Sequence, residues 1–235
     1  MLYIIGLGLN PDGISKFGLH VVKKCKKIYL ENYTIDFPYS KNEIEEMLGK
    51  KVVPAGREFV ESLKIVDEAK KKDIALLVYG SPLTATTHIS LIQEAKNSGV
   101  KYKVIYAASI FDAVAETGLQ IYKFGKIASM PKWKKSFTPD SFMKIIQENQ
   151  SMNAHSLILI DIGLEFKDAL KQLKVSAKKY GIDLKKILLC QRLGTKGKKI
   201  SYREVEEFEK YDDVKKPYCI IIPGKLHFVE KEFLG

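Results

Sequence analysis

Short runs of apolar, β-branched residues recur along this chain, and each is followed by a turn and then by a stretch with helical periodicity. Such runs are typical of strands buried on both faces, as in parallel sheets that helices cover on each side. The alternation therefore predicts an α/β fold. The strands expected in the first half are Leu2–Ile5, Lys27–Glu31, Lys51–Val53, Ile74–Tyr79 and Lys103–Tyr106. The helices expected between them are Ser15–Lys24, Glu43–Leu48, Glu58–Lys71 and Thr87–Ser98.

The second half restarts this alternation with different spacing. Its expected strands are Gly125–Met130, Ser156–Ile162, Ile187–Gln191 and Tyr218–Pro223. Helix Phe166–Tyr180 has one apolar face, and a second helix is expected to start with Thr138 as its cap and Pro139 as its first residue. The change near residues 108–115 predicts two α/β domains, 1–110 with a parallel sheet and 111–235.

Composition and cysteine spacing restrict the class of protein. An apolar content of 46% over 235 residues can bury a core without disulfides or metal. Cys25, Cys190 and Cys219 are far apart, which predicts buried thiols in a reducing compartment and no metal site. Gly6 and Gly8 interrupt the apolar N-terminus, which lacks basic residues, so we expect a buried strand there and not a signal peptide. We therefore expect a soluble, cytoplasmic protein with no membrane span.

The formal net charge of +11 suggests an anionic partner, which nucleic acid would satisfy. However, only Arg57, Arg192 and Arg203 are arginines among the 39 basic residues, and bidentate recognition of phosphate or guanine favours arginine. The lysines are also interspersed with acids. Solvated lysine-rich surfaces are the simpler interpretation, and attraction to an acidic protein or to RNA is the alternative.

Two glycines follow the first expected strand, in the segment Gly6–Pro11. Here a dinucleotide-binding fingerprint would begin, but the third glycine is missing and Pro11 takes its place, so a nicotinamide cofactor is not favoured. Glycines still allow the backbone to approach a ligand closely. The alternative is a plain tight turn.

Three further loops after expected strands contain small or polar residues. Gly80–His88 has a glycine, a proline and several hydroxyls, and Ala107–Ser109 is small where bulk would block a cleft. Pro223–Glu230 follows the last expected strand. Ligands of open α/β sheets bind beyond the carboxyl ends of the strands, so these loops are candidates for binding. Each has a structural alternative: a helix start at Thr87, a cap at Ser109, a structural role for His88, and an ordinary exit loop.

Taken in order, these segments together with Gly118–Gly125 resemble the diphthine synthase family, within the tetrapyrrole methylase superfamily. The resemblance extends from Met1 to Glu230. It implies two α/β domains with S-adenosylmethionine in the cleft between them, usually in a homodimer. Carried over by position, the implied cofactor contacts are Leu9, Ser81, Thr84, Ser109, Ile110, Ile160, Leu193 and His227.

The resemblance also implies an activity, which is transfer of methyl to the aminocarboxypropyl-histidine of translation elongation factor 2 in diphthamide biosynthesis. Such transfer depends on alignment more than on acid–base groups, so no catalytic residue is assigned. Two departures from the family pattern are Ser81, where an aspartate is usual, and Gly163, where a lysine is usual. The chain is also shorter than typical members between Ile162 and Lys186.

Two other functions stay open at this point. One is a catalytically impaired or non-enzymatic binding module with the same fold, which the departure at Ser81 would suit. The other is a relative that methylates a tetrapyrrole or ribosomal RNA.

Overall fold

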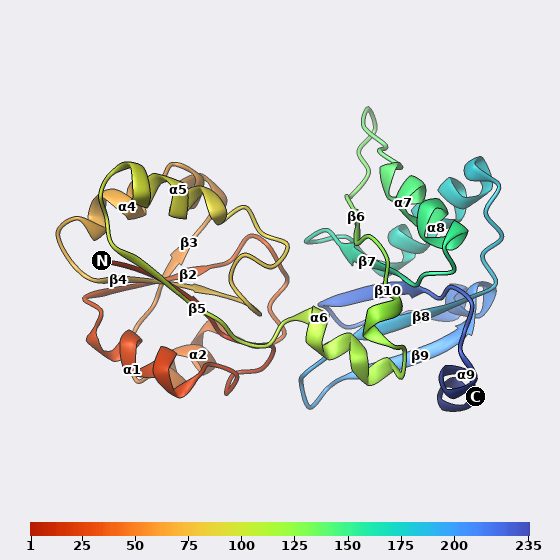
Figure 1. The fold of residues 1–235 in the computed structure, drawn as a ribbon, viewed down its shortest axis with the longest axis horizontal. Coiled ribbons are helices and arrows are strands. Elements are labelled where there is room, and N and C mark those ends of the chain that lie inside the picture. The colour runs from red at the N-terminus through yellow and green to blue at the C-terminus, as the bar shows by residue number, and fades with distance from the viewer. The chain divides into compact units, whose positions relative to one another are not determined.

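A computed structural model describes all residues from Met1 to Gly235, and the chain divides into two compact units, Met1–Ala113 and Val114–Gly235. Each unit is built on one five-stranded sheet with its own hydrophobic core (Figure 1). No helix has both the length and the apolar character that a membrane span requires. The α/β class that the alternating pattern predicts is confirmed.

The sheet of the first unit has the strand order β3-β2-β4-β1-β5, and every neighbouring pair is parallel. Its strands are β1 (Leu2–Gly6), β2 (Lys27–Glu31), β3 (Val53–Ala55), β4 (Ile74–Val78) and β5 (Tyr102–Ile105). Because all five run in the same direction, their carboxyl ends lie along one edge of the sheet. The loops that leave this edge are therefore brought side by side by the topology.

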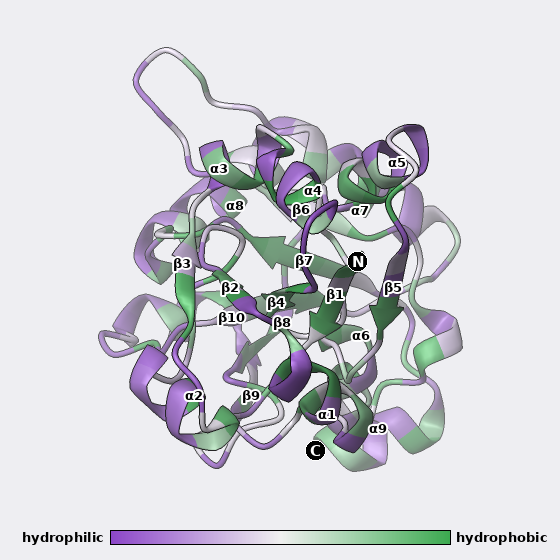
Figure 2. Cartoon of the chain, turned by 90° about the vertical axis from the view of Figure 1, so that its left-hand side faces the viewer, coloured by the Kyte–Doolittle hydropathy of each residue, from purple (hydrophilic) through white to green (hydrophobic).

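Helices cover both faces of this sheet. The helices of this unit are α1 (Lys16–Lys24), α2 (Lys41–Leu48), α3 (Arg57–Glu61), α4 (Lys64–Ala69), α5 (Ile89–Asn97) and α6 (Ile110–Ala113), of which α1 and α2 cover one face and α4 and α5 the other. Alternate residues of β1 face opposite cores: Ile4 clusters with residues of α4 and α5, and Ile5 with residues of α1 and α2. Figure 1 shows these two pairs of helices on opposite sides of the sheet. Figure 2 shows the result, with the central strands coloured hydrophobic. Burial of every residue of β4, and of every residue of β1 except Tyr3, explains their continuous apolar sequences.

Two expected elements of this unit differ in the structure. The single helix expected at Glu58–Lys71 is wrong, because Leu63 adopts a left-handed backbone with φ of 62° and separates α3 from α4. The apolar stripe passes through this break, so periodicity alone does not reveal it. Strand β3 also begins two residues later than Lys51–Val53 predicted.

The sheet of the second unit is mixed, with the order β6-β7-β10-β8-β9. Only β6 and β7 are parallel neighbours. Its strands are β6 (Ala128–Met130), β7 (Ser156–Ile160), β8 (Lys186–Gln191), β9 (Lys199–Glu204) and β10 (Tyr218–Ile222). The helical elements are α7 (Ser141–Ser151), α8 (Phe166–Tyr180), α9 (Phe228–Leu234) and three 3-10 turns, η1 (Val114–Thr117), η2 (Ile121–Lys123) and η3 (Val205–Lys210).

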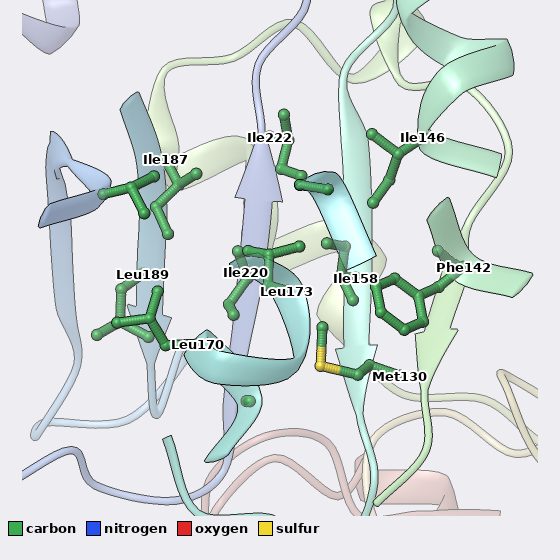
Figure 3. Close-up of a cluster of buried hydrophobic side chains, with 14 of the residues drawn as sticks. Met130, Phe142, Ile146, Ile158, Leu170, Leu173, Ile187, Leu189, Ile220 and Ile222 are labelled. Atoms are coloured by element: carbon green, nitrogen blue, oxygen red, sulfur yellow. The ribbon is translucent and has the colours of Figure 1, made fainter. Parts of the chain in front are cut away.

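One face of this sheet carries the core of the second unit. Figure 3 shows Leu170 and Leu173 of α8 directed onto the central strands, with Phe142 of α7 beside Ile158. Helix Phe166–Tyr180 has the bounds that its periodicity predicts. The expected Thr138 cap is wrong, because the N-cap position is Asp140 and α7 starts at Ser141.

Candidate functional site

The loops that follow β4, β1 and β5 meet around Gly6, the last residue of β1. A Cβ atom at Gly6 would lie 2.6 Å from the carbonyl oxygen of Gly80, 2.8 Å from Cδ of Pro82 and 3.0 Å from Cβ of Ala107. No side chain fits at Gly6 without displacing the two neighbouring loops. This close approach gathers the three loops at the carboxyl edge of the sheet, where ligands of α/β proteins bind.

Gly8 and Gly80 tie the first two of these loops together. Each adopts a positive φ, of 72° and 69°, and their backbones exchange hydrogen bonds of 3.0 and 2.9 Å. The Tyr79 hydroxyl donates to the carbonyl oxygen of Leu9 at 3.2 Å, which fixes Leu9 where it is almost fully buried. A Cβ atom at Gly80 would lie 3.8 Å from the Ala108 carbonyl oxygen and 3.9 Å from Cα of Ser109, which is ordinary van der Waals contact, so a group could lie against Gly80 without displacing its neighbours.

The segment after β4 has a strained backbone. Leu83 and Ala85 have φ values of 65° and 54°, which side-chain-bearing residues rarely adopt. Ser81 is buried, Thr84 is half-buried, and the Thr84 N–H donates to the Ser81 carbonyl at 3.3 Å. Strain of this kind is concentrated at binding and catalytic loops.

Ser109 directly precedes α6 and caps it, as the sequence indicates. Its N–H and its hydroxyl both donate to the Asp112 carboxylate, at 2.6 and 2.9 Å, and its oxygen accepts from the Phe111 N–H at 3.2 Å. The hydroxyl is thus already committed to the cap. Ser109 therefore offers a ligand its small size and its main chain, and Ile110 beside it offers a half-buried apolar surface.

His88 ends the same strained segment and is almost fully buried. Its Nε2 atom lies 3.3 Å from the Tyr33 hydroxyl, whereas its Nδ1 atom and the Thr86 hydroxyl have no hydrogen-bond partner. Burial lowers the pKa of His88 to about 4, so the ring is neutral. The structural role expected for His88 accounts for only one of its two nitrogens.

The buried state of His88 gives a pH-dependent stability. Unfolded chains bind a proton below about pH 6.5, and the folded chain does so only below about 4, so stability should be lost as pH falls between these values. We expect this loss to reach about 3 kcal/mol. Urea unfolding of the wild type and of His88→Gln at pH 7.5 and pH 4.5 measures it, since the variant should lose that much less. An equal loss of stability in both proteins would contradict a buried, neutral His88.

Ile160 and Leu193 of the second unit share one edge of its sheet. Ile160 ends β7 and Leu193 follows β8, and these strands are parallel to each other because each is antiparallel to β10 between them. The beginning of β10 lies at the same edge, where the Arg192 N–H donates to the Pro217 carbonyl at 2.8 Å. Arg192, next to the predicted contact Leu193, has a φ of 47°, so the backbone is strained here as it is at Leu83 and Ala85.

His227 lies elsewhere. It follows the far end of β10, where Ile222 pairs with Ser156 at the start of β7, and so it lies beyond the sheet edge opposite to Ile160. The Glu230 carboxylate accepts from the His227 N–H at 2.7 Å and from His155 Nε2 at 3.0 Å. The structure therefore does not group His227 with Ile160 and Leu193.

Glu230 also explains why Gly118–Gly125 and Pro223–Glu230 are distinctive in sequence. Its fully buried carboxylate accepts from the Gln120 N–H at 2.9 Å and from the Lys123 ammonium group. Burial acts to raise the pKa of Glu230, but these donors outweigh it and hold the pKa at about 2. The two segments thus form one structural junction, which no local sequence pattern indicates.

The sequence and the fold of this chain are both similar to those of known methylases. The family described as Tetrapyrrole (Corrin/Porphyrin) Methylases matches residues 1–209. The chain is 39% identical to the diphthine synthase of Methanocaldococcus jannaschii, over 100% of this chain and 97% of the relative. It is 34% identical to the diphthine methyl ester synthase of Saccharomyces cerevisiae, over 100% and 88%. A crystal structure of a diphthine synthase matches with a TM-score of 0.90 and 32% identity, over 99% of this chain and 94% of that one.

Proposed function

Because this chain belongs to the tetrapyrrole methylase family, and within it to the diphthine synthases, we propose that it uses S-adenosylmethionine to methylate modified elongation factor 2. The chain is a methyltransferase with the α/β fold of that family. Full-length identity to diphthine synthases favours this activity over methylation of a porphyrinoid or of ribosomal RNA.

The observation that carries the proposal is the convergence of three loops on Gly6. A ligand group could lie against the Gly80 backbone in van der Waals contact with Ala108 and Ser109. We propose that Leu9, Ser81, Thr84, Ser109 and Ile110 of the first unit contact the cofactor. Ile160, Leu193 and His227 are the contacts proposed from the second unit on the family resemblance, although His227 lies at the end of that sheet opposite to Ile160 and Leu193.

The role of the protein in this reaction is alignment. S-adenosylmethionine would supply a methyl group on a sulfonium: an amine or a carboxylate forms a bond to the methyl carbon as the carbon–sulfur bond breaks, and the sulfur leaves as a neutral thioether. The fixed loops at Gly6 and Gly80 would hold the cofactor in one orientation and exclude water from it. Isothermal titration with S-adenosylmethionine tests the proposal, and absence of binding heat at millimolar cofactor would contradict it. A homodimer stays a prediction from the family resemblance.

The departure at Ser81 gives a second prediction. Ser81 is buried beside the proposed site and offers only a neutral hydroxyl, whereas the usual aspartate would pair with the ammonium group of the cofactor. Ser81→Asp should therefore tighten cofactor binding by about 1 kcal/mol, roughly fivefold. Titration of Ser90→Asp, which adds the same charge on the exposed side of α5, should leave the affinity unchanged. Weaker binding by Ser81→Asp would place Ser81 away from the ammonium group.

A further inference from the structure

The other half of the same sheet edge carries polar side chains that the proposed cofactor loops do not use. The cofactor loops follow β4, β1 and β5, whereas Tyr33 follows β2 and Arg57 follows β3, on the other side of β4. The segment after β4 belongs to both halves, because it starts at Gly80 beside Gly8 and ends at His88 beside Tyr33. A ligand at Tyr33 would therefore lie next to a ligand at Gly80.

Two buried polar atoms near Tyr33 have no hydrogen-bond partner. His88 is 1% exposed, and its Nδ1 atom has no partner. The Thr86 hydroxyl, two residues earlier, is also buried without a partner. Buried polar atoms are nearly always paired in native proteins, so two such atoms in one strained loop indicate a group that binds there.

Tyr33 and Arg57 are held in place around this pair. The buried Glu31 carboxylate accepts from the N–H groups of Tyr33 and Thr34, each at 2.7 Å, and this fixes the turn that carries Tyr33. The Arg57 guanidinium stacks over the Tyr33 ring, 5.0 Å from its centroid, while its Nη1 donates to Glu61 at 3.1 Å. Arg57 is exposed, so a cation lies at the rim and a neutral histidine and a phenol lie beneath it.

We propose that Tyr33, His88 and Arg57 form the subsite for the methyl acceptor. This inference rests on the proposed function, in which the acceptor is an aminocarboxypropyl group on a protein side chain. Its carboxylate matches the planar donors of Arg57, and its nitrogen matches the Tyr33–His88 pair. An acceptor bound there is adjacent to the cofactor loops through the shared segment after β4.

The test is a pair of hydroxyl deletions measured with the modified factor as substrate. Tyr33→Phe keeps the ring under Arg57 and removes only the group that bonds His88, so the KM for the factor should rise about tenfold with little change in kcat. Tyr29→Phe is the matched control, since the Tyr29 hydroxyl is also hydrogen-bonded to side chains, among them Glu68 at 2.6 Å, from within β2. It should leave KM unchanged.

A second pair tests the cation. Arg57→Lys keeps the charge but loses the planar donors, and it should raise the same KM by about tenfold. Arg203→Lys is its control, because Arg203 makes an equivalent pair with Glu207 four residues on, at 3.2 Å, in the second unit. For every variant, cofactor affinity by titration should equal that of the wild type.

The outcomes distinguish failure of the proposed function from failure of the acceptor subsite. A wild type that binds no S-adenosylmethionine and labels no factor overturns the proposed function. An active wild type, with KM values unchanged in Tyr33→Phe and Arg57→Lys, overturns the acceptor subsite alone. A loss of cofactor affinity in these variants also overturns it, because the residues would then serve the cofactor.

Discussion

Gly6→Ala should lower the free energy of unfolding by about 3 kcal/mol and reduce methyl transfer by about a hundredfold. The added Cβ would lie 2.6 Å from the Gly80 carbonyl oxygen and 2.8 Å from Pro82, and neither atom is the end of a flexible side chain. The loops after β1 and β4 must then move apart. Since they define the proposed cofactor site, binding should be lost together with stability.

Gly56→Ala is the control for this substitution. Gly56 precedes α3 with a φ of −74°, and a Cβ atom there would meet nothing within 4 Å. Both proteins would be compared by urea unfolding and by titration with S-adenosylmethionine. If Gly6→Ala bound the cofactor as tightly as Gly56→Ala does, the site would lie away from this junction of loops.

The parts of the fold that periodicity determines were predictable. Strand β2 and helix α8 have the predicted bounds, because each buries a regular stripe or a continuous apolar run. The break at Leu63 was not predictable. A left-handed backbone at a residue other than glycine is imposed by the packing around it, and no sequence pattern indicates it. Strand β9 was missed because it is an edge strand whose residues are largely exposed and charged.

The candidate site likewise has a part that local sequence patterns predict and a part that they do not. The loops at Gly8, Gly80 and Ser109 were found because small residues follow apolar strands whose direction the parallel pattern fixes. His227 was predicted as a contact from the family resemblance, and strand direction gives no further support for it, because β10 runs against β7 and β8. Strand direction in a mixed sheet is a long-range property. The same holds for the contact of Tyr33 with His88, which are 55 residues apart.

The largest difference in activity should lie between two forms of the substrate. Elongation factor 2 that carries the aminocarboxypropyl group on its target histidine should be methylated, and the unmodified factor should receive no methyl above background. An unmodified imidazole lacks the reactive amine, and it extends less far from the factor's backbone than the aminocarboxypropyl side chain does. The extended side chain can bring its nitrogen in line with the sulfonium while the factor stays outside.

Transfer of radiolabelled methyl from S-adenosylmethionine tests the account most directly. The purified chain would be offered the modified factor, the unmodified factor, ribosomal RNA and uroporphyrinogen in parallel. Label is expected on the modified factor alone. Label on RNA or on the porphyrinoid, with none on the modified factor, would contradict it.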